Sequence, residues 1–472
     1  MAGRARYSNK TRDVVIIGAG PAGIFAALEL VRVDPCLDVL MLEAGKDISA
    51  RHCPMQTGPG KCVNCSPCSI LGGWGGSGAF SDGKLTLTSE FGGFLDQYAG
   101  KDEVERLIEY VDRTYLDFGA TEQVFGTEEE VVRELMRRCA TAGLRLVPGK
   151  IRHLGTEKCP EILRRMYEFL KDKVEIRTGT PVKMIVAEGG SVKGVVTADG
   201  EEIPARYVIG APGRRGAEWF TGEAKRLGIG LFTNPVDIGV RVEVPAVVFE
   251  PLTAKVYEPK IIYHSASFDD PVRTFCVCPN GQVVVENSGG LMTVNGHSLR
   301  EHKTDNTNFA LLVSKTFTEP FKEPIAYGKY IASLANMLGG GVIVQRLGDL
   351  QAGRRSTEKR LAKGMVRPTL AEATPGDLSL VLPYRYLIDI LEMLESLDQV
   401  APGVNSRHTL LYGVEVKFYS SRLDVGPDLQ TRIRNLYAAG DGAGITRGLA
   451  QASASGVYVA RGILNREGRA VH

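Results

Sequence analysis

The chain has 472 residues, enough for two or three domains or for one large interrupted domain. Its 43% hydrophobic and 24% charged residues are ordinary globular values, which exclude a disordered or fibrous chain. The net charge of +2 gives no general reason to expect a nucleic acid partner. Glycine is frequent, with 55 residues, so we expect loops whose backbone approaches another group closely.

The apolar runs and the number of cysteines indicate where in the cell the protein is located. Charged residues, Gly or Pro interrupt every apolar run before ~18 residues, so no integral membrane segment is expected. The apolar stretch near the N-terminus contains the glycine turn described next, which argues against a cleaved signal peptide. Nine cysteines are too few for a disulfide scaffold in a chain of this length. A cytoplasmic location is therefore predicted.

A strand–turn–helix–strand pattern opens the chain. Two β-branched or apolar runs, 14–17 and 39–42, flank a helical pattern at 21–31. The sequence Gly18-Ala19-Gly20-Pro21-Ala22-Gly23 lies at the turn, and Glu43-Ala44 follows the second strand. This context is typical of a dinucleotide site: the glycines allow a tight turn, approach of a pyrophosphate and close helix packing, while Glu43 accepts from a ribose hydroxyl.

The remaining elements alternate in type along the chain. We expect helices at 102–116, 160–172 and 386–397, and strands at 181–187, 192–197 and 206–209. The last segment, 435–465, is another strand, glycine turn and helix. The two ends of the chain therefore predict one α/β domain, with a second domain inserted between them.

Four cysteines lie within a glycine-rich loop: Cys53, Cys62, Cys65 and Cys68. They are the ligand types of a four-thiolate iron–sulfur cluster or of tetrahedral zinc. Redox-active or paired thiols, and inert loop thiols, remain alternatives. The separate Cys276-x-Cys278 lies in an apolar, strand-like run and is expected to belong to the core.

Candidate catalytic groups lie in the inserted region. Glu415 and Lys417 share one strand face by period two, so they are a candidate acid–base pair or else a surface ion pair. His297, within the turn-like Asn295-Gly296-His297-Ser298, offers a titratable imidazole. Arg354-Arg355 is a candidate binding site for a carboxylate or phosphate of a substrate.

Three further motifs resemble those of FAD-dependent oxidoreductases. They are Leu436 to Gly444, Tyr207 to Gly213 and Pro181-Val182-Lys183. The resemblance implies that the dinucleotide is FAD, with Asp441 on the ribityl hydroxyls. The other implied cofactor contacts are Val182, Ala211, Gly213, Gly440 and Gly444.

A closer resemblance is to a family of bacterial FAD-dependent dehydrogenases. It rests on Gly72-Gly73-Trp74-Gly75-Gly76-Ser77-Gly78-Ala79-Phe80-Ser81-Asp82-Gly83-Lys84 and on segments 235–241, 411–419 and 440–448. It implies that Ser77 and Gly78 contact the cofactor and that Lys84 reaches the flavin, where it stabilises charge or donates a proton. The implied reaction is hydride transfer between flavin N5 and a small organic molecule, with an external electron donor or acceptor.

The expected fold is an α/β, Rossmann-like FAD/NAD(P)-binding three-layer domain, discontinuous, with an inserted α+β substrate domain. Its expected segments are 1–100 for the first FAD-binding part with the Cys/Gly-rich loop, 101–215 for a helical segment plus the second FAD-binding part, 216–430 for the inserted substrate domain and 431–472 for the third FAD-binding part. Rival interpretations are a C=C reductase similar to geranylgeranyl reductases, a flavoprotein RNA modifier and a flavin/thiol redox sensor.

Overall fold

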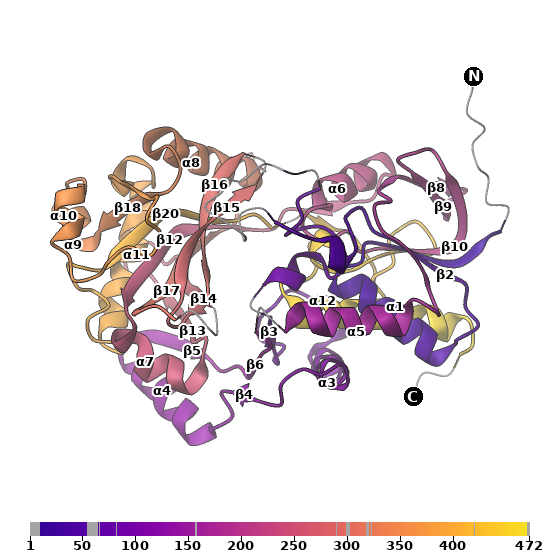
Figure 1. The fold of residues 1–472 in the computed structure, drawn as a ribbon, viewed down its shortest axis with the longest axis horizontal. Coiled ribbons are helices and arrows are strands. Elements are labelled where there is room, and N and C mark those ends of the chain that lie inside the picture. The colour runs from indigo at the N-terminus through magenta and orange to yellow at the C-terminus, as the bar shows by residue number, and fades with distance from the viewer. Residues whose placement is uncertain are drawn as a thin grey trace. The chain divides into compact units, whose positions relative to one another are not determined.

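A computed structural model describes residues 10–53, 65, 67–81, 83–155, 158–288, 290–298, 303–317, 321, 323–419 and 421–469. The chain divides into two compact units. The first contains Met1–Gln123, Arg152–Asn234 and Ser420–His472, and the second contains Val124–Ile151 and Pro235–Tyr419. Figure 1 shows the elements of both units with their labels.

The first unit contains a central sheet and helices. Strand β6 (Ile151–His153) has its first residue in the second unit and the other two in the first. The other elements of the first unit are β1 (Arg12–Ile17), α1 (Pro21–Val33), β2 (Val39–Leu42), η1 (Ile48–Ala50), η3 (Gly76–Phe80), β3 (Lys84–Thr86), α2 (Asp96–Ala99), α3 (Lys101–Asp117), α5 (Cys159–Leu170), β7 (Glu175–Arg177), β8 (Val182–Glu188), β9 (Ser191–Thr197), β10 (Glu202–Gly210), α6 (Ala217–Arg226), β11 (Leu231–Phe232), β21 (Arg422–Leu423), β22 (Leu436–Ala438), η5 (Asp441–Ala443) and α12 (Leu449–Arg466).

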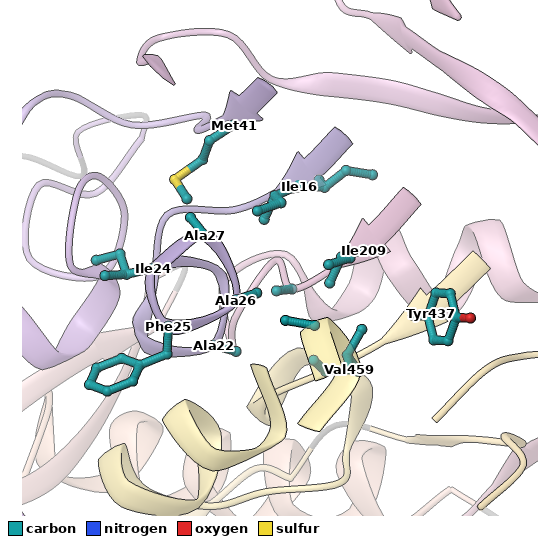
Figure 2. Packing of buried hydrophobic residues seen from close by; sticks show 14 of the residues in the cluster. Ile16, Ala22, Ile24, Phe25, Ala26, Ala27, Met41, Ile209, Tyr437 and Val459 are labelled. Atoms are coloured by element: carbon teal, nitrogen blue, oxygen red, sulfur yellow. The ribbon is translucent and has the colours of Figure 1, made fainter. Parts of the chain in front are cut away.

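The central sheet joins distant parts of the chain. Strands β7, β2, β1, β10 and β22 are parallel neighbours in that order, and the antiparallel β8–β9 hairpin continues from the first half of β10. Ile16 pairs with both Met41 and Ile209, and Ile209 pairs in turn with Tyr437. These strands lie side by side in Figure 2. The N- and C-terminal segments therefore complete one sheet.

Small side chains let two helices approach each other and the sheet. Ala22 and Ala26 of α1 are buried on the side of the helix that faces Val459 of α12, and Ala27 is buried on the side that faces Met41 of the sheet (Figure 2). A Cβ at Gly456 of α12 would overlap the carbonyl oxygen of Ala22. Because no side chain separates the backbones at this position, α12 is fixed against the start of α1.

The second unit is built on a large, mainly antiparallel sheet. Its strands follow the order β19-β18-β20-β12-β17-β14-β13-β5, and β15–β16 forms a separate hairpin. Its elements are β4 (Val124–Phe125), α4 (Glu129–Thr141), β5 (Leu144–Val147), β12 (Val236–Pro245), α7 (Ala246–Val256), β13 (Lys260–His264), β14 (Pro271–Cys278), β15 (Gln282–Ser288), β16 (Leu291–His297), β17 (Asn306–Lys315), α8 (Pro324–Gly339), β18 (Ile343–Arg346), α9 (Leu347–Gln351), α10 (Glu358–Ala362), β19 (Thr374–Pro375), η4 (Leu378–Leu380), α11 (Tyr384–Asp398) and β20 (Leu410–Lys417).

The α/β fold class, with its discontinuous dinucleotide-binding topology and inserted α+β unit, is confirmed. Three segments differ from the expected boundaries: residues 216–234 and 420–430, expected in the inserted domain, group with the first unit, and residues 124–151, expected with the FAD-binding part, group with the second. The last difference arises because β5 pairs with β13 and adds an edge strand to the second sheet. Within the part of the chain that the structure describes, no helix has the length and apolar character needed to cross a membrane.

Candidate functional site

The first glycine turn has one open position between two closed ones. Gly18 has a φ of +103°, and a Cβ there would overlap the carbonyl of Ala211. A Cβ at Gly23 would overlap the carbonyl oxygen of Gly18. At Gly20, in contrast, φ is −82° and the nearest atom to an added Cβ is the Cα of Gly76, 4.0 Å away. Gly18 and Gly23 therefore serve chain packing, whereas Gly20 leaves room above the turn.

A second glycine-rich loop lies against this turn. The amide of Gly75 donates to the carbonyl of Ala19 at 2.7 Å, and the loop continues into η3. A Cβ at Gly78 would come within 2.6 Å of Leu449 Cδ2, which belongs to the start of α12. Ser77 is half-buried beside it. The expected cofactor loop is thus in contact with the start of both α1 and α12.

Arg51 fixes the shape of the second loop. Its guanidinium lies 4.7 Å from the centre of the Phe80 ring, and burial lowers the pKa of Arg51 to about 10. It donates hydrogen bonds of 2.5–2.9 Å to the carbonyls of Ser69, Ile70, Trp74 and Gly76. Because the planar guanidinium of Arg51 binds carbonyls spread along the loop, this one side chain fixes the backbone conformation of the loop.

Glu43 has a backbone role that the motif alone does not reveal. Its Oε1 accepts from the amides of Gly45 at 2.7 Å and Gly73 at 2.9 Å, and its Oε2 accepts from the amide of Ala19 at 2.8 Å. The carboxylate therefore ties the first glycine turn to the second loop. An ionised carboxylate has about four acceptor sites, so acceptor capacity remains for a ribose hydroxyl.

The C-terminal glycine segment closes the site from the other end of the chain. Gly440 has a φ of +76°, its amide donates to Ser455 Oγ at 3.0 Å, and an added Cβ would lie 3.0 Å from the Cβ of Ala22. A Cβ at Gly442 would lie 2.6 Å from the carbonyl oxygen of Gly213. We call the Gly18–Gly23 turn, loop 72–80 and segment 440–444 the glycine cradle.

Asp441 lies in this cradle. Thr446 Oγ1 donates to its Oδ1 at 2.7 Å. Burial raises the pKa of Asp441, and the positive charge of Arg214 opposes this shift. The carboxylate is half-buried in the chain itself, so it can still accept from a polyol hydroxyl.

The cradle fits an anionic dinucleotide. An added Cβ would meet no atom within 4 Å at Gly213 or at Gly448, the residue before α12. The first turn of α1 has no acidic residue and no side-chain cap, so its N–H groups and positive dipole end are available to an anion. Open space, backbone donors and the carboxylate of Asp441 thus occur together. The structure brings together these predicted cofactor residues: Gly18, Gly20, Pro21, Ala22, Gly23, Glu43, Ala44, Ser77, Gly78, Ala211, Gly213, Gly440, Asp441 and Gly444.

Val182 and Lys84 take up other positions of the first unit. Val182 begins β8 and pairs with Thr197. Lys84 begins β3, directly after Gly83, whose carbonyl accepts from the amide of Leu154. Both side chains are half-buried, and their roles stay predictions.

The candidate pair Glu415 and Lys417 is a buried ion pair. Lys417 Nζ lies 2.9 Å from Glu415 Oε1, and the Glu415 side chain is 0% exposed. Nη1 of Arg241, also 0% exposed, lies 3.4 Å from each oxygen of this carboxylate. The surface ion pair considered from the sequence is therefore wrong, because β20 is buried along its whole length, with β12 paired beside Glu415 and Lys417 and β16 packed against it. Whether the pair transfers a proton stays a prediction.

Two other candidates have different surroundings from those expected. His297 ends strand β16 opposite Gln282 of β15, so the expected turn is wrong: the hairpin reverses direction at the other end of β16. Arg354 Nε pairs with Asp349 at 3.0 Å, and Asp349 also binds Arg346. Arg354 is thus part of a local ion-pair network, whereas Arg355 is exposed.

The cysteine loop is described only in part. Cys53 is buried and Cys65 and Cys68 are half-buried, while Cys62 lies outside the described residues. No group of three or more potential metal-ligating side chains was found among the residues with a described position. The iron–sulfur or zinc site stays a prediction.

Several positioning residues were missed from the sequence. Arg51, Ser455 and Gly456 come from segments without a cofactor motif, yet they shape loop 72–80, the Gly440 turn and the α1–α12 crossing. The run Ala452-Ser453-Ala454-Ser455-Gly456 was a usable signal, because a stretch of small residues on a helix permits close backbone approach.

Two sequence comparisons find relatives. Residues 235–418 match the profile of a family described as "FAD-dependent protein, C-terminal domain-like". An uncharacterized protein of Clostridium beijerinckii is 27% identical over 480 residues, covering 96% of this chain and 80% of its own. The family match supports FAD as the cofactor, and neither comparison identifies a substrate.

Solved structures with a similar course of the chain are flavoenzymes of several kinds. An L-proline dehydrogenase from P. horikoshii has a TM-score of 0.41 at 12% identity, covering 98% of this chain and 95% of that one. A variant of Aspergillus oryzae formate oxidase has a TM-score of 0.47 at 13% identity, covering 98% and 99%. These scores are too low for an activity to be inferred from either enzyme.

Proposed function

We propose that the protein is an FAD-dependent oxidoreductase that holds its cofactor in the glycine cradle. The observation that carries this proposal is the meeting of Gly20 of the first turn with Gly76, and of Gly440 with Ala22. A strand–glycine–helix turn with an acidic residue after the next strand is typical of dinucleotide binding, and the family match names FAD.

The residues of the cradle would bind FAD through distinct groups. The N-terminus of α1 and the backbone at Gly20 would hold the pyrophosphate, and Glu43 would accept from the ribose. Asp441 would accept from ribityl hydroxyls, held in orientation by Thr446. Arg51 would act indirectly by keeping loop 72–80 closed against the turn.

FAD would supply two-electron transfer with a small organic molecule, and an external donor or acceptor would complete the cycle. Lys84 follows loop 72–80 and would donate a proton or stabilise negative charge near the cofactor. Glu415, Lys417 and His297 of the second unit are the further candidates for proton transfer.

The sharpest test is Gly20→Ala. The backbone of Gly20 is extended and an added Cβ meets only open space, so the unliganded protein should tolerate alanine within about 1 kcal/mol. A pyrophosphate at this position would collide with that methyl group. We expect FAD affinity, measured by fluorescence titration of the apoprotein, to fall about tenfold or more, equivalent to about 1.4 kcal/mol.

Gly462→Ala is the matched control. Position 462 lies on α12 and is equally open, but it is distant in sequence from the glycine segment, so FAD affinity should be unchanged. Wild-type protein that binds no FAD after reconstitution would contradict the proposal. Equal FAD affinity of the Gly20→Ala variant and the wild type would show that the pyrophosphate does not bind at this turn.

A further inference from the structure

Two cysteines lie beside the buried ion pair of the second unit. Cys276 and Cys278 end β14, and their Sγ atoms are 4.0 Å apart. Cys278 is fully buried, whereas Cys276 is half-buried. Cys276 is therefore the more accessible of the two residues, and its sulfur lies next to the buried sulfur of Cys278.

A β-bulge produces this arrangement. Opposite β17, Phe275 pairs with Ala310 and Cys278 pairs with Asn308, so β14 contains one more residue than its partner over this stretch. Cys276 has a φ of +47°, a conformation that is strained for a non-glycine residue and persists only where its surroundings fix it. Nη2 of Arg241 donates to the carbonyl of Cys276 at 2.6 Å and so holds the bulge.

Two cations, Arg241 and Lys417, lie near the two sulfurs. Nη2 of Arg241 also donates to Sγ of Cys278 at 3.2 Å. Arg241 and Lys417 share the fully buried carboxylate of Glu415, and the next carboxylate, Glu286, is more exposed and lies 4.0 Å from Lys417. Adjacent cations favour the thiolate over the thiol, and the thiolate is the reactive form. We call Arg241, Glu415, Lys417, Cys276 and Cys278 the charge cluster.

The fold makes room for this cluster. Asn308 Oδ1 accepts from Arg241 Nε at 2.8 Å, and a Cβ at Gly296 would overlap the Arg241 guanidinium. Glycine on β16 therefore allows the buried cation to reach β14. Burial opposes the charged form, but Glu415 and the two cysteines raise the pKa of Arg241, so it remains positive.

We propose that Cys276 and Cys278 form a redox-active dithiol that exchanges two electrons with low-molecular-weight disulfides. The Cys276 thiolate attacks one sulfur of a disulfide such as oxidised glutathione, which breaks its S–S bond and releases one glutathione thiolate. The Cys278 thiolate then attacks Cys276 Sγ and releases the second glutathione. The protein gains one intramolecular disulfide, and the oxidant is reduced to two thiols that receive the two cysteine protons.

In this exchange Arg241 and Lys417 are positioning residues. Arg241 holds the bulge and stabilises the Cys278 thiolate, while Lys417, 5.6 Å from the centre of the Phe275 ring, is a second cation that interacts electrostatically with Cys276. The proposal rests on the second unit alone and does not depend on bound FAD.

The full-length protein, reduced and desalted without oxygen, should be equilibrated with glutathione mixtures of increasing oxidised fraction. After acid quenching and alkylation, peptide mass spectrometry should show loss of both thiols together in one transition, with a Cys276–Cys278 disulfide. Cys139 is an internal control, because burial raises its pKa to about 11, and it should remain alkylatable only after denaturation. Separate reduced thiols at every ratio, or pairing with another cysteine, would overturn the proposal.

Variants separate the roles of the two sulfurs. Cys278→Ser should leave a single glutathione adduct on Cys276, whereas Cys276→Ser should leave Cys278 unmodified because it is buried; the reverse pattern would overturn the order of attack. Lys417→Met should slow alkylation of Cys276 by iodoacetamide about tenfold, the effect of one pKa unit on the thiolate fraction. The exposed Lys363→Met is the matched control. An unchanged rate in Lys417→Met would remove its positioning role.

Discussion

The glycine cradle and the charge cluster are formed by opposite kinds of residue. In the cradle, missing side chains matter: glycines let backbones touch at Ala22 and Gly213 and leave open space at Gly20. In the charge cluster, large ionised side chains are buried and each depends on its neighbour. The difference teaches that the first site is specified by local sequence, whereas the second is specified by partners on separate strands. The two sites should therefore fail in different ways when they are mutated.

The largest effect is expected at Glu415. Glu415→Ala leaves Arg241 and Lys417 buried without their shared carboxylate, which should lower the free energy of unfolding by about 3–5 kcal/mol. Urea denaturation monitored by circular dichroism measures this. Glu286→Ala, at the edge of the same cluster, should cost less than about 1 kcal/mol. Equal effects of the two variants would mean that the cluster is not organised around Glu415.

Arg51 combines features of both sites, because it is a charged side chain that determines the conformation of a glycine-rich loop. Arg51→Met removes hydrogen bonds to four loop carbonyls, and we expect a loss of about 2–3 kcal/mol. Hydrogen exchange should rise in segment 67–81 and remain unchanged in β12 and β20. Unchanged exchange in the loop would show that Glu43 and the Gly75–Ala19 bond hold it without Arg51.

A Cβ in the closed part of the cradle should cost less. Gly23→Ala places a methyl group against the carbonyl of Gly18, so α1 must shift, at about 1–3 kcal/mol. Thermal unfolding of the apoprotein measures the change, with Gly462→Ala as the control that adds a methyl group in open space. If Gly20→Ala destabilised the apoprotein as much as Gly23→Ala, the distinction between open and closed glycines would be wrong.

The smallest effect concerns a second buried carboxyl group of the inserted unit. Asp389 is fully buried, and burial together with the nearby charge of Asp270 raises the pKa of Asp389 to about 6. A raised carboxyl pKa means that the folded state favours the proton, so stability falls as the pH rises from about 4 to about 6. Asp389→Asn should remove this loss and raise Tm at pH 7 by about 2–4 °C relative to its effect at pH 4. An equal shift at both pH values would exclude protonation of Asp389 as the cause.

The cradle was largely predictable, because each glycine reports a local backbone requirement that is written into its own segment. The Gly18–Gly23 turn and Glu43 were identified from the spacing of strands, glycines and an acidic residue, whereas the Gly440 segment was identified by its resemblance to FAD-dependent oxidoreductases. What could not be predicted was the structural work of Glu43, whose amide partners include Gly73, thirty residues later. Arg51 has no motif, since its partners are backbone carbonyls that any sequence supplies.

The charge cluster was beyond sequence reasoning for a different reason. Glu415 and Lys417 were correctly placed on one strand face, but their burial depends on β12, which pairs beside them, and on β16, which packs against β20. Cys276 and Cys278 looked like core residues because the register shift opposite β17 leaves no mark in the composition of β14. His297 was assigned to a turn because Asn-Gly is frequent in turns, yet pairing with Gln282 extends the strand through it.

The position of β10 between β1 and β22 has a consequence for biosynthesis. When the ribosome has made β10, its partner β22 is still more than two hundred residues away, about 10–45 s at ~5–20 residues per second. Until then β10 presents an unpaired edge, and α1 lacks the cover that α12 provides. The second unit completes its own sheet once β20 has been made. Nascent chains halted before residue 436 should therefore require chaperones to protect the first unit, even though the second has already folded.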